Sequence, residues 1–208
     1  MSQRRFSAAV RVNGSFWLLV LLAAIVSPLT VVAAILSAAA LHELGHLAAM
    51  RHYGVTVKCF RLTALGAELD APSLARLSYG RELVVTLAGV TVNVLCASAL
   101  ALLGLRLWRE WCFVFAGAHL VLAAFNLLPV VPLDGARALC LALSFFLGPA
   151  TGERITAAVS LACSLALCAL GLKLSLGLHS GWLFAFAAFG LLWGTLRQLG
   201  LARGGKSV

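Results

Sequence analysis

Leu41-His42-Glu43-Leu44-Gly45-His46-Leu47 lies within residues 29–50, a run that is otherwise apolar. The run predicts a helix, and His42 and His46 share one face of it because they are four residues apart. Two imidazoles at this spacing can hold one metal ion, and Glu43 beside them can take a proton from a bound water. The alternative is two histidines that only bridge neighbouring helices. Burying His, Glu and His in an apolar helix costs several kcal/mol without compensation, so the pattern favours a metal.

The composition is that of a membrane protein. Of the 208 residues, 62% are hydrophobic and 11% are charged, whereas soluble domains are about 45–50% apolar and about 25% charged. The net charge of +9 would suit nucleic acid, but the basic residues flank apolar runs, a pattern that fixes orientation in a lipid bilayer. We therefore expect one integral-membrane domain, 1–208, with its core in 10–147, additional helices in 155–196, and no nucleic-acid partner.

The apolar runs predict an all-α polytopic membrane protein with about six transmembrane helices. The expected spans are residues 15–26, 29–50, 82–105, 111–128, 155–172 and 181–196. The basic tail and first run look like a signal peptide, but cleavage at the small residues 37–40 would cut the helix that presents His42. We expect the first span to be retained, although it is shorter than the ~20 residues of a full crossing.

Residues 55–62 break the helical pattern, because apolar and polar side chains alternate there as in a β-strand. Residues 65–68 then offer a turn, and a small β element at the membrane edge would fit both features. One hypothesis is that the 55–62 strand presents a free edge on which an unwinding substrate pairs. The alternative is that the strand only packs against the lipid headgroups.

The basic residues also predict the orientation. Six spans place both termini on one side, and only Arg106, Arg109 and Lys173 then lie opposite. The excess of positive charge makes the side of the termini cytoplasmic in a cell membrane. Because His46 is five residues before Arg51, the predicted metal site lies about 7–8 Å below that interface.

A catalytic zinc site needs a third protein ligand, and Asp134 is the best candidate. It lies in an apolar environment, after a segment in which Pro129 and Pro132 interrupt the helix and free backbone carbonyls. Such irregular backbone is tolerated at membrane depth only where protein or a water-filled cavity surrounds it. The alternative role for Asp134 is to cap a helix that begins at Ala136, and both roles can coexist.

Two motifs together resemble the site-2 protease family of intramembrane metalloproteases. H-E-L-G-H at residues 42–46 is followed by N-x-x-P-x-x-P-L-D-G at residues 126–135. The short first span, the strand segment and A-G-x-x-x-N at residues 88–93 also match, so the resemblance covers residues 10–147. With six spans and no inserted PDZ domain, the chain is most similar to the stage IV sporulation protein FB group.

The resemblance implies a zinc metalloendopeptidase. His42, His46 and Asp134 would hold Zn²⁺, Glu43 would act as general base and then acid, and Asn126 would orient substrate or stabilise the oxyanion. The substrate would be a membrane-associated proprotein cut near the cytoplasmic face, with a pro-sigma factor in sporulation the most specific candidate, and regulatory membrane proteins would be further partners. Two features depart from the family: Val90 replaces its usual proline, and no nucleotide-binding CBS domain is expected.

Two other functions use the same residues. A zinc-binding transporter or channel would spread its ligands along a pathway, whereas Glu43 beside a ligand and an open fourth position favour catalysis. A catalytically inactive membrane chaperone is disfavoured because no motif residue is missing. His119 lies in the middle of the fourth span, and we interpret it as a packed or hydrogen-bonded core histidine rather than a ligand. His52 and His179 are expected at the interfaces.

Overall fold

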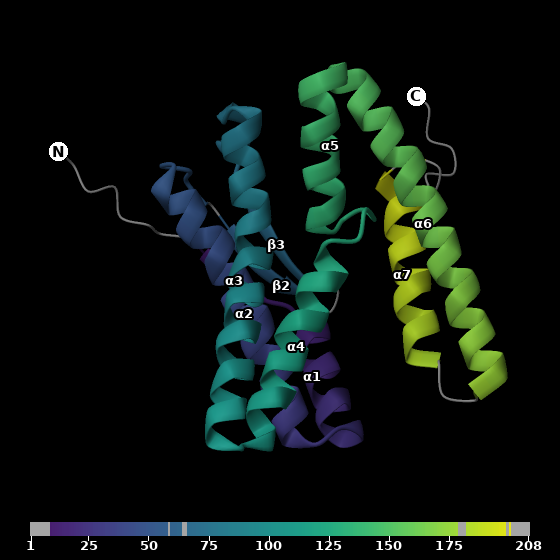
Figure 1. The fold of residues 1–208 in the computed structure, drawn as a ribbon. Helices are drawn as coiled ribbons and strands as arrows, with labels where there is room; N and C mark the ends of the chain where they lie inside the picture. Colours follow the sequence, from purple (N-terminus) through teal and green to yellow (C-terminus); the bar gives the residue numbers. More distant parts are fainter. Residues whose placement is uncertain (1–8, 58, 64–65, 179–181, 199, 201–208) are drawn as a thin grey trace. The chain divides into compact units, whose positions relative to one another are not determined.

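The computed structural model describes residues 9–57, 59–63, 66–178, 182–198 and 200, and it divides into two compact units, Met1–Ala124 and Phe125–Val208. The first unit contains β1 (Ala9–Val12), α1 (Gly14–Val26), α2 (Leu29–His52), β2 (Cys59–Thr63), β3 (Gly66–Asp70), the 3-10 helix η1 (Leu74–Arg76), α3 (Tyr79–Leu107) and nearly all of α4 (Glu110–Asn126). The second contains α5 (Asp134–Leu147), α6 (Pro149–Leu178) and α7 (Trp182–Gln198). Figure 1 shows these elements along the chain.

Each apolar run that the sequence predicts as a span is helical over most of its length, although the fourth helix ends at Asn126 and not at residue 128, and residue 181 of the sixth run lies outside the described residues. Among the described residues, three helices are long and apolar enough to cross a membrane: α2, α3 and Pro149–Leu176 of α6. The helix α4 is apolar but shorter, and α1 has 13 residues, about 20 Å against a hydrocarbon core of about 30 Å. Large side chains such as Ile25 and Leu29 are exposed on these helices. The chain is thus a membrane protein, and the full number of six spans stays a prediction.

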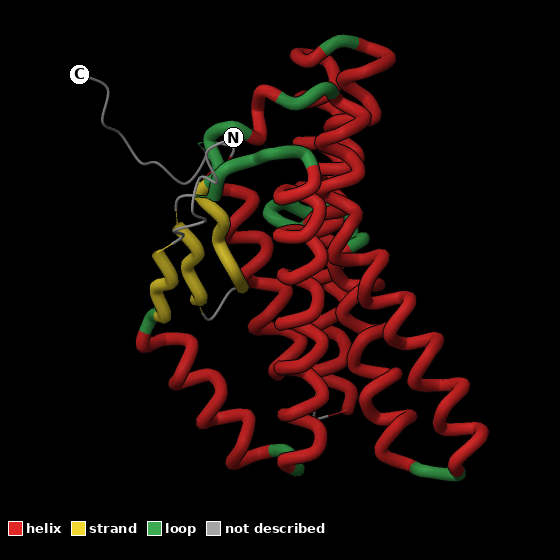
Figure 2. Tube along the Cα trace, turned by 90° about the vertical axis from the view of Figure 1, so that its left-hand side faces the viewer, coloured by secondary structure: helices red, strands yellow, loops and turns green. Residues whose placement is uncertain are grey.

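The β element is a three-stranded sheet in the order β1-β2-β3, with its strands side by side in Figure 2. The strand β2 runs parallel to β1 and antiparallel to β3. The prediction for this region was wrong in detail. The strand begins at Cys59 and not at Val55, and residues 66–68 of the predicted turn belong to β3.

The end of α2 explains why the strand begins late. Gly54 adopts a left-handed conformation with φ of +70°, as a helix-ending glycine does. The backbone N–H of Gly54 donates to the Arg51 carbonyl, and that of Val55 donates to the Met50 carbonyl, which together form a Schellman motif. The N–H of Thr56 donates to Ser73 Oγ at 3.0 Å. The first backbone donors of the predicted strand are therefore already used.

Because β2 is the central strand, its backbone is paired on both sides along Cys59–Leu62. The hypothesis that this strand offers a free edge to a substrate is therefore wrong.

In the second unit, α6 packs against both α5 and α7 (Figure 1). Gly148 ends α5 with φ of +85°, and Pro149 begins α6. Proline is well tolerated there because the first N–H groups of a helix have no intrahelical acceptor.

Candidate metal site

His42 and His46 lie on one face of α2, as predicted, and both are buried. Their Nε2 atoms are 3.1 Å apart and their rings meet nearly at right angles, with an interplanar angle of 83°. Two nitrogens at ~2.0–2.1 Å from one tetrahedral zinc lie about 3.3 Å apart. The two ring nitrogens are therefore spaced as a pair of zinc ligands would be.

The orientation of the His46 ring is fixed from behind by α3. Its Nδ1 lies 2.8 Å from the backbone carbonyl oxygen of Val85. A carbonyl can only accept, so Nδ1 carries the proton and donates it, and Nε2 keeps its lone pair. This is the arrangement that orients a metal-binding histidine. The Val85 side chain belongs to a buried cluster with Met50, Val55 and Val57, which holds the carbonyl in place.

Gly89, one turn further along α3, leaves the space that the two imidazoles fill. A Cβ atom at this position would lie 2.5 Å from His46 Nε2 and 2.8 Å from His42 Cε1. Both distances are far below van der Waals contact. Gly89 belongs to the A-G-x-x-x-N stretch, but the sequence analysis gave it no role, because the neighbour of a glycine on another helix is not visible in the sequence.

Asn93, a further turn along α3, contacts the other histidine. Its Nδ2 is 3.3 Å from His42 Nδ1, and its Oδ1 is 3.1 Å from His119 Nδ1 on α4. Asn93 is fully buried and His119 is 1% exposed. The interpretation of His119 as a hydrogen-bonded core histidine is confirmed. The sequence analysis missed its link to the metal-ligand candidate through Asn93.

The close approach of α2 and α3 depends on a second glycine, Gly45. A Cβ there would lie 2.8 Å from the backbone carbonyl oxygen of Ala88. In H-E-L-G-H this position follows Leu44 and precedes the second histidine, so the motif itself contains the residue that lets α3 reach both imidazoles. Glu43 lies on the same helix and is half-buried.

Asn126 and Asp134 belong to the second unit. Asn126 is the last residue of α4 and Asp134 the first of α5, and both are half-buried. The alternative role for Asp134, capping a helix that begins at Ala136, does not hold, because α5 begins at Asp134 itself and its N-cap residue is Leu133. A carboxylate in the first turn still interacts favourably with the helix dipole. That these two residues join the histidines in one site stays a prediction.

The irregular segment between Asn126 and Asp134 is held by hydroxyl groups from later helices. Ser160 Oγ on α6 donates to the Pro129 carbonyl at 2.9 Å, and Thr195 Oγ1 on α7 lies 3.2 Å from the Val131 carbonyl. Ser160 and Thr195 are fully buried. Protein hydroxyl groups therefore reach two of the freed carbonyls, those of Pro129 and Val131. The sequence did not reveal which residues supply the donors.

The donor set fits zinc. Imidazole nitrogens and a carboxylate oxygen are its ordinary ligands, and His46 presents the required lone pair. The spacing of the two Nε2 atoms and their burial suit a single ion better than two solvated side chains. His42 and His46 are therefore suited to hold a zinc ion, and Asp134 stays the predicted third ligand.

Comparisons with known proteins identify the fold. No protein-family model matches the sequence, and no curated protein matches it. Among solved structures, the chain is similar to the site-2 protease from Methanocaldococcus jannaschii, with a TM-score of 0.69 and 20% sequence identity. The match covers 96% of this chain and 94% of that one. The chain therefore has a site-2 protease fold, as the resemblance implied.

Proposed function

We propose that the protein is an intramembrane zinc metalloprotease that hydrolyses a peptide bond of a membrane-associated protein. The observation that carries the proposal is the buried pair of imidazoles with facing Nε2 atoms 3.1 Å apart. It lies on the first helix long enough to cross a membrane, in a chain with a site-2 protease fold. The placement of Glu43 next to a ligand favours hydrolysis over metal transport.

Each site residue has a proposed role. His42, His46 and Asp134 hold the zinc ion, which when bound would supply an acidic water as the nucleophile. Glu43 accepts the proton of that water and returns it to the leaving amine. Asn126, at the end of α4, orients the substrate or donates to the developing oxyanion through its side-chain amide. We propose that both units form one protease domain around this ligand set.

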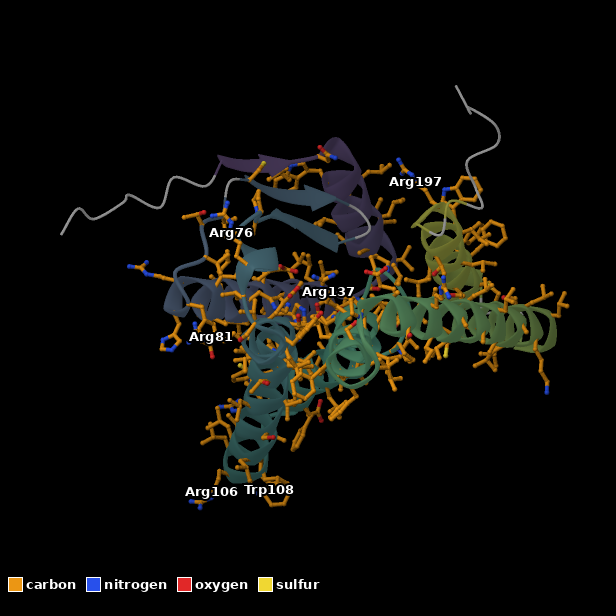
Figure 3. The ribbon with its side chains drawn as sticks, turned by 90° about the horizontal axis from the view of Figure 1, so that it is seen from above. Arg76, Arg81, Arg106, Trp108, Arg137 and Arg197 are labelled. Atoms are coloured by element: carbon orange, nitrogen blue, oxygen red, sulfur yellow. The ribbon has the colours of Figure 1, made fainter. Side chains whose placement is uncertain are left out.

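The membrane orientation is proposed from α3. This helix has 29 residues, about 43 Å at 1.5 Å per residue, which matches a bilayer with its headgroups. Arg81 lies near its start and Arg106 near its end, and Figure 3 shows the two arginines far apart, with Trp108 next to Arg106. The predominance of basic residues at the Arg81 end would make that side, with both termini, cytoplasmic.

The substrate and setting follow from the resemblance alone. We propose a membrane-associated proprotein cut near the cytoplasmic face, with regulatory membrane proteins as partners. A pro-sigma factor processed during sporulation is the narrowest form of this proposal, and it rests on the likeness to the stage IV sporulation protein FB group.

The test compares Glu43→Gln with the wild type. The amide cannot take up a proton at neutral pH. The rate of cleavage should therefore fall by about 10²–10⁴-fold while zinc content stays unchanged. Mass spectrometry of membrane proteins from cells expressing either form would identify peptides produced only by the wild type. Glu110→Gln is the matched control, because Glu110 begins α4 at an exposed position.

Two outcomes separate the candidate functions, and a third tests the ligand set. Wild-type cleavage by Glu43→Gln would overturn the protease assignment. Movement of zinc across vesicle membranes by the wild type, with no cleaved protein, would favour the transporter. Undiminished zinc in Asp134→Ala would remove Asp134 from the ligand set.

A further inference from the structure

Four hydrogen bonds connect α4, α3 and α2 in a single series. His119 Nδ1 lies 3.1 Å from Asn93 Oδ1, and Asn93 Nδ2 lies 3.3 Å from His42 Nδ1. His42 Nε2 lies 3.1 Å from His46 Nε2, whose Nδ1 lies 2.8 Å from the Val85 carbonyl oxygen. All four side chains are buried, so each bond is made away from bulk water.

With the three imidazoles neutral, the protons in this series have one consistent arrangement. The Val85 carbonyl accepts from His46 Nδ1, so His46 Nε2 must accept from His42 Nε2. His42 Nδ1 then has no proton and accepts from the Asn93 amide NH₂, while Asn93 Oδ1 accepts from His119 Nδ1. All donors therefore point the same way, from α4 towards α2 and back to α3.

Metal binding requires the opposite arrangement at His42. Its Nε2 must offer a lone pair, so the single proton of the neutral ring moves to Nδ1 and needs an acceptor there. Asn93 already contacts Nδ1, and a half-turn of its amide would present Oδ1 in place of the NH₂ group. The NH₂ group would then face His119, which must hold its proton on Nε2 in order to accept.

We propose that Asn93 and His119 are positioning residues of the metal site: the orientation of the Asn93 amide selects the tautomer of His42, and His119 stabilises that amide in either orientation. The proposal rests on the proposed function in one respect, that His42 binds zinc. An asparagine suits this position because it carries both a donor and an acceptor. A histidine suits the position behind it, because a neutral imidazole can donate or accept through the same Nδ1 atom.

A purely structural role would predict something different. If Asn93 only fills space between helices, an apolar residue of similar size should serve as well in an apolar interior. If it selects the tautomer, the essential property is an acceptor facing His42 Nδ1. Asn93→Leu removes this acceptor at nearly constant volume. Asn93→Asp keeps the acceptor. A carboxylate that accepts a hydrogen bond from a metal-bound histidine is a common arrangement in metal sites.

The first experiment measures zinc affinity of the detergent-purified full chain by chelator competition, which needs no substrate. We expect Asn93→Leu to weaken zinc binding about 10–100-fold, the usual effect of removing a partner of a metal-bound histidine, and Asn93→Asp to bind as tightly as wild type or more tightly. Ser98→Ala is the matched control on α3, because the exposed Ser98 hydroxyl donates to the Val94 carbonyl of its own helix.

The second experiment places His119 in the series through a double-mutant cycle. His119→Phe should weaken zinc binding less than Asn93→Leu does, because the amide remains but loses its support. Asn93→Leu with His119→Phe should bind no more weakly than Asn93→Leu alone, since His119 acts through Asn93. Additive losses would show that His119 acts independently and would overturn its assigned role.

The third experiment uses the wild-type protein with ¹⁵N-labelled histidine. NMR distinguishes protonated from unprotonated ring nitrogens, so it reads each tautomer directly. Adding zinc should move the proton of His119 from Nδ1 to Nε2, although His119 is not a ligand. An unchanged His119 tautomer in protein that binds zinc would overturn the proposal, as would equal zinc affinity of Asn93→Leu and wild type. Wild-type protein that binds no zinc would instead overturn the proposed function.

Discussion

The histidine face of the first unit consists of His42, His46, Asn93 and His119, and the proline segment of the second unit is residues 127–133. The two regions satisfy the hydrogen bonds of their polar groups in different ways. Both place polar groups inside an apolar helical protein. At the histidine face the backbone is regular, and side chains from α2, α3 and α4 bond to one another and to the Val85 backbone carbonyl. At the proline segment the backbone itself is irregular, and its carbonyls accept from hydroxyls on α6 and α7. The first solution depends on side-chain geometry, and the second on backbone support.

A glycine in each region tests this difference, because each leaves no space for a Cβ atom. At Gly135, in the first turn of α5, the Cβ would meet the backbone carbonyls of Leu127 and Leu128. At Gly89 it would meet the tips of two imidazoles. Backbone carbonyls cannot move without rebuilding the segment, whereas side chains can rotate. The two substitutions should therefore have different consequences.

Gly135→Ala should have the largest effect on stability. The new methyl group cannot be accommodated beside the Leu127 carbonyl, so we expect a loss of more than about 3 kcal/mol or no folded protein at all. Yield of monodisperse protein and thermal unfolding in detergent would measure it. Gly117→Ala on α4 is the control, because a Cβ there meets nothing within 4 Å. Wild-type stability of Gly135→Ala would show that the segment is not packed as described.

Gly89→Ala should keep the fold but lose the metal. Alanine favours the helix by about 1 kcal/mol over glycine, which offsets part of the strain, and the displaced imidazoles can no longer converge. We expect zinc affinity to fall at least 10-fold with little change in thermal unfolding. Gly80→Ala on the same helix is the control, since nothing lies within 4 Å of its Cβ position. Unchanged zinc affinity would separate Gly89 from the site.

The regular region was the easier one to predict from the sequence. Periodicity alone places His42 and His46 on one helical face, and apolar length alone marks α2 and α3. The residues of α3 that contact these histidines could not be predicted in this way. The Val85 carbonyl has no signature in the sequence, and the contacts of Gly89 and Asn93 depend on how two helices pack. A pattern within one helix is local information, whereas a contact between helices is not.

The irregular region was predicted only in outline. Two prolines show that the helix must break, and polar backbone in an apolar protein must find donors. Which residues donate depends on α6 and α7, which follow far along the chain. The strand prediction failed for a related reason. Alternation in residues 55–62 was real, but Val55 and Thr56 donate to a helix end and to Ser73, and such competing partners are not visible in the pattern.

The smallest predicted effect concerns the support of the proline segment by α7. The Thr195 hydroxyl lies 3.2 Å from the Val131 carbonyl, 2.9 Å from the Leu191 carbonyl and 3.2 Å from Ser164 Oγ. Thr195→Val keeps the shape and removes the donor. Polar contacts in membrane helices average about 0.6 kcal/mol, and an orphaned buried carbonyl costs about 1–3 kcal/mol. We expect a loss of roughly 1 kcal/mol, or about 2–4 °C in Tm for a chain of this size.

Thr195→Ser separates the hydrogen bond from packing, because it keeps the hydroxyl and removes only a methyl group. If the hydroxyl supports the segment, thermal unfolding of Thr195→Ser should lie closer to wild type than that of Thr195→Val. Ser160→Ala removes the other donor, to the Pro129 carbonyl. Adding it to Thr195→Val should lower Tm by more than either change alone, since the segment then loses both supports. A Thr195→Val protein as stable as wild type, with Thr195→Ser less stable, would mean that the methyl group and not the hydroxyl matters. The backbone of this region would then be held by packing, as the histidine face is held by its side chains.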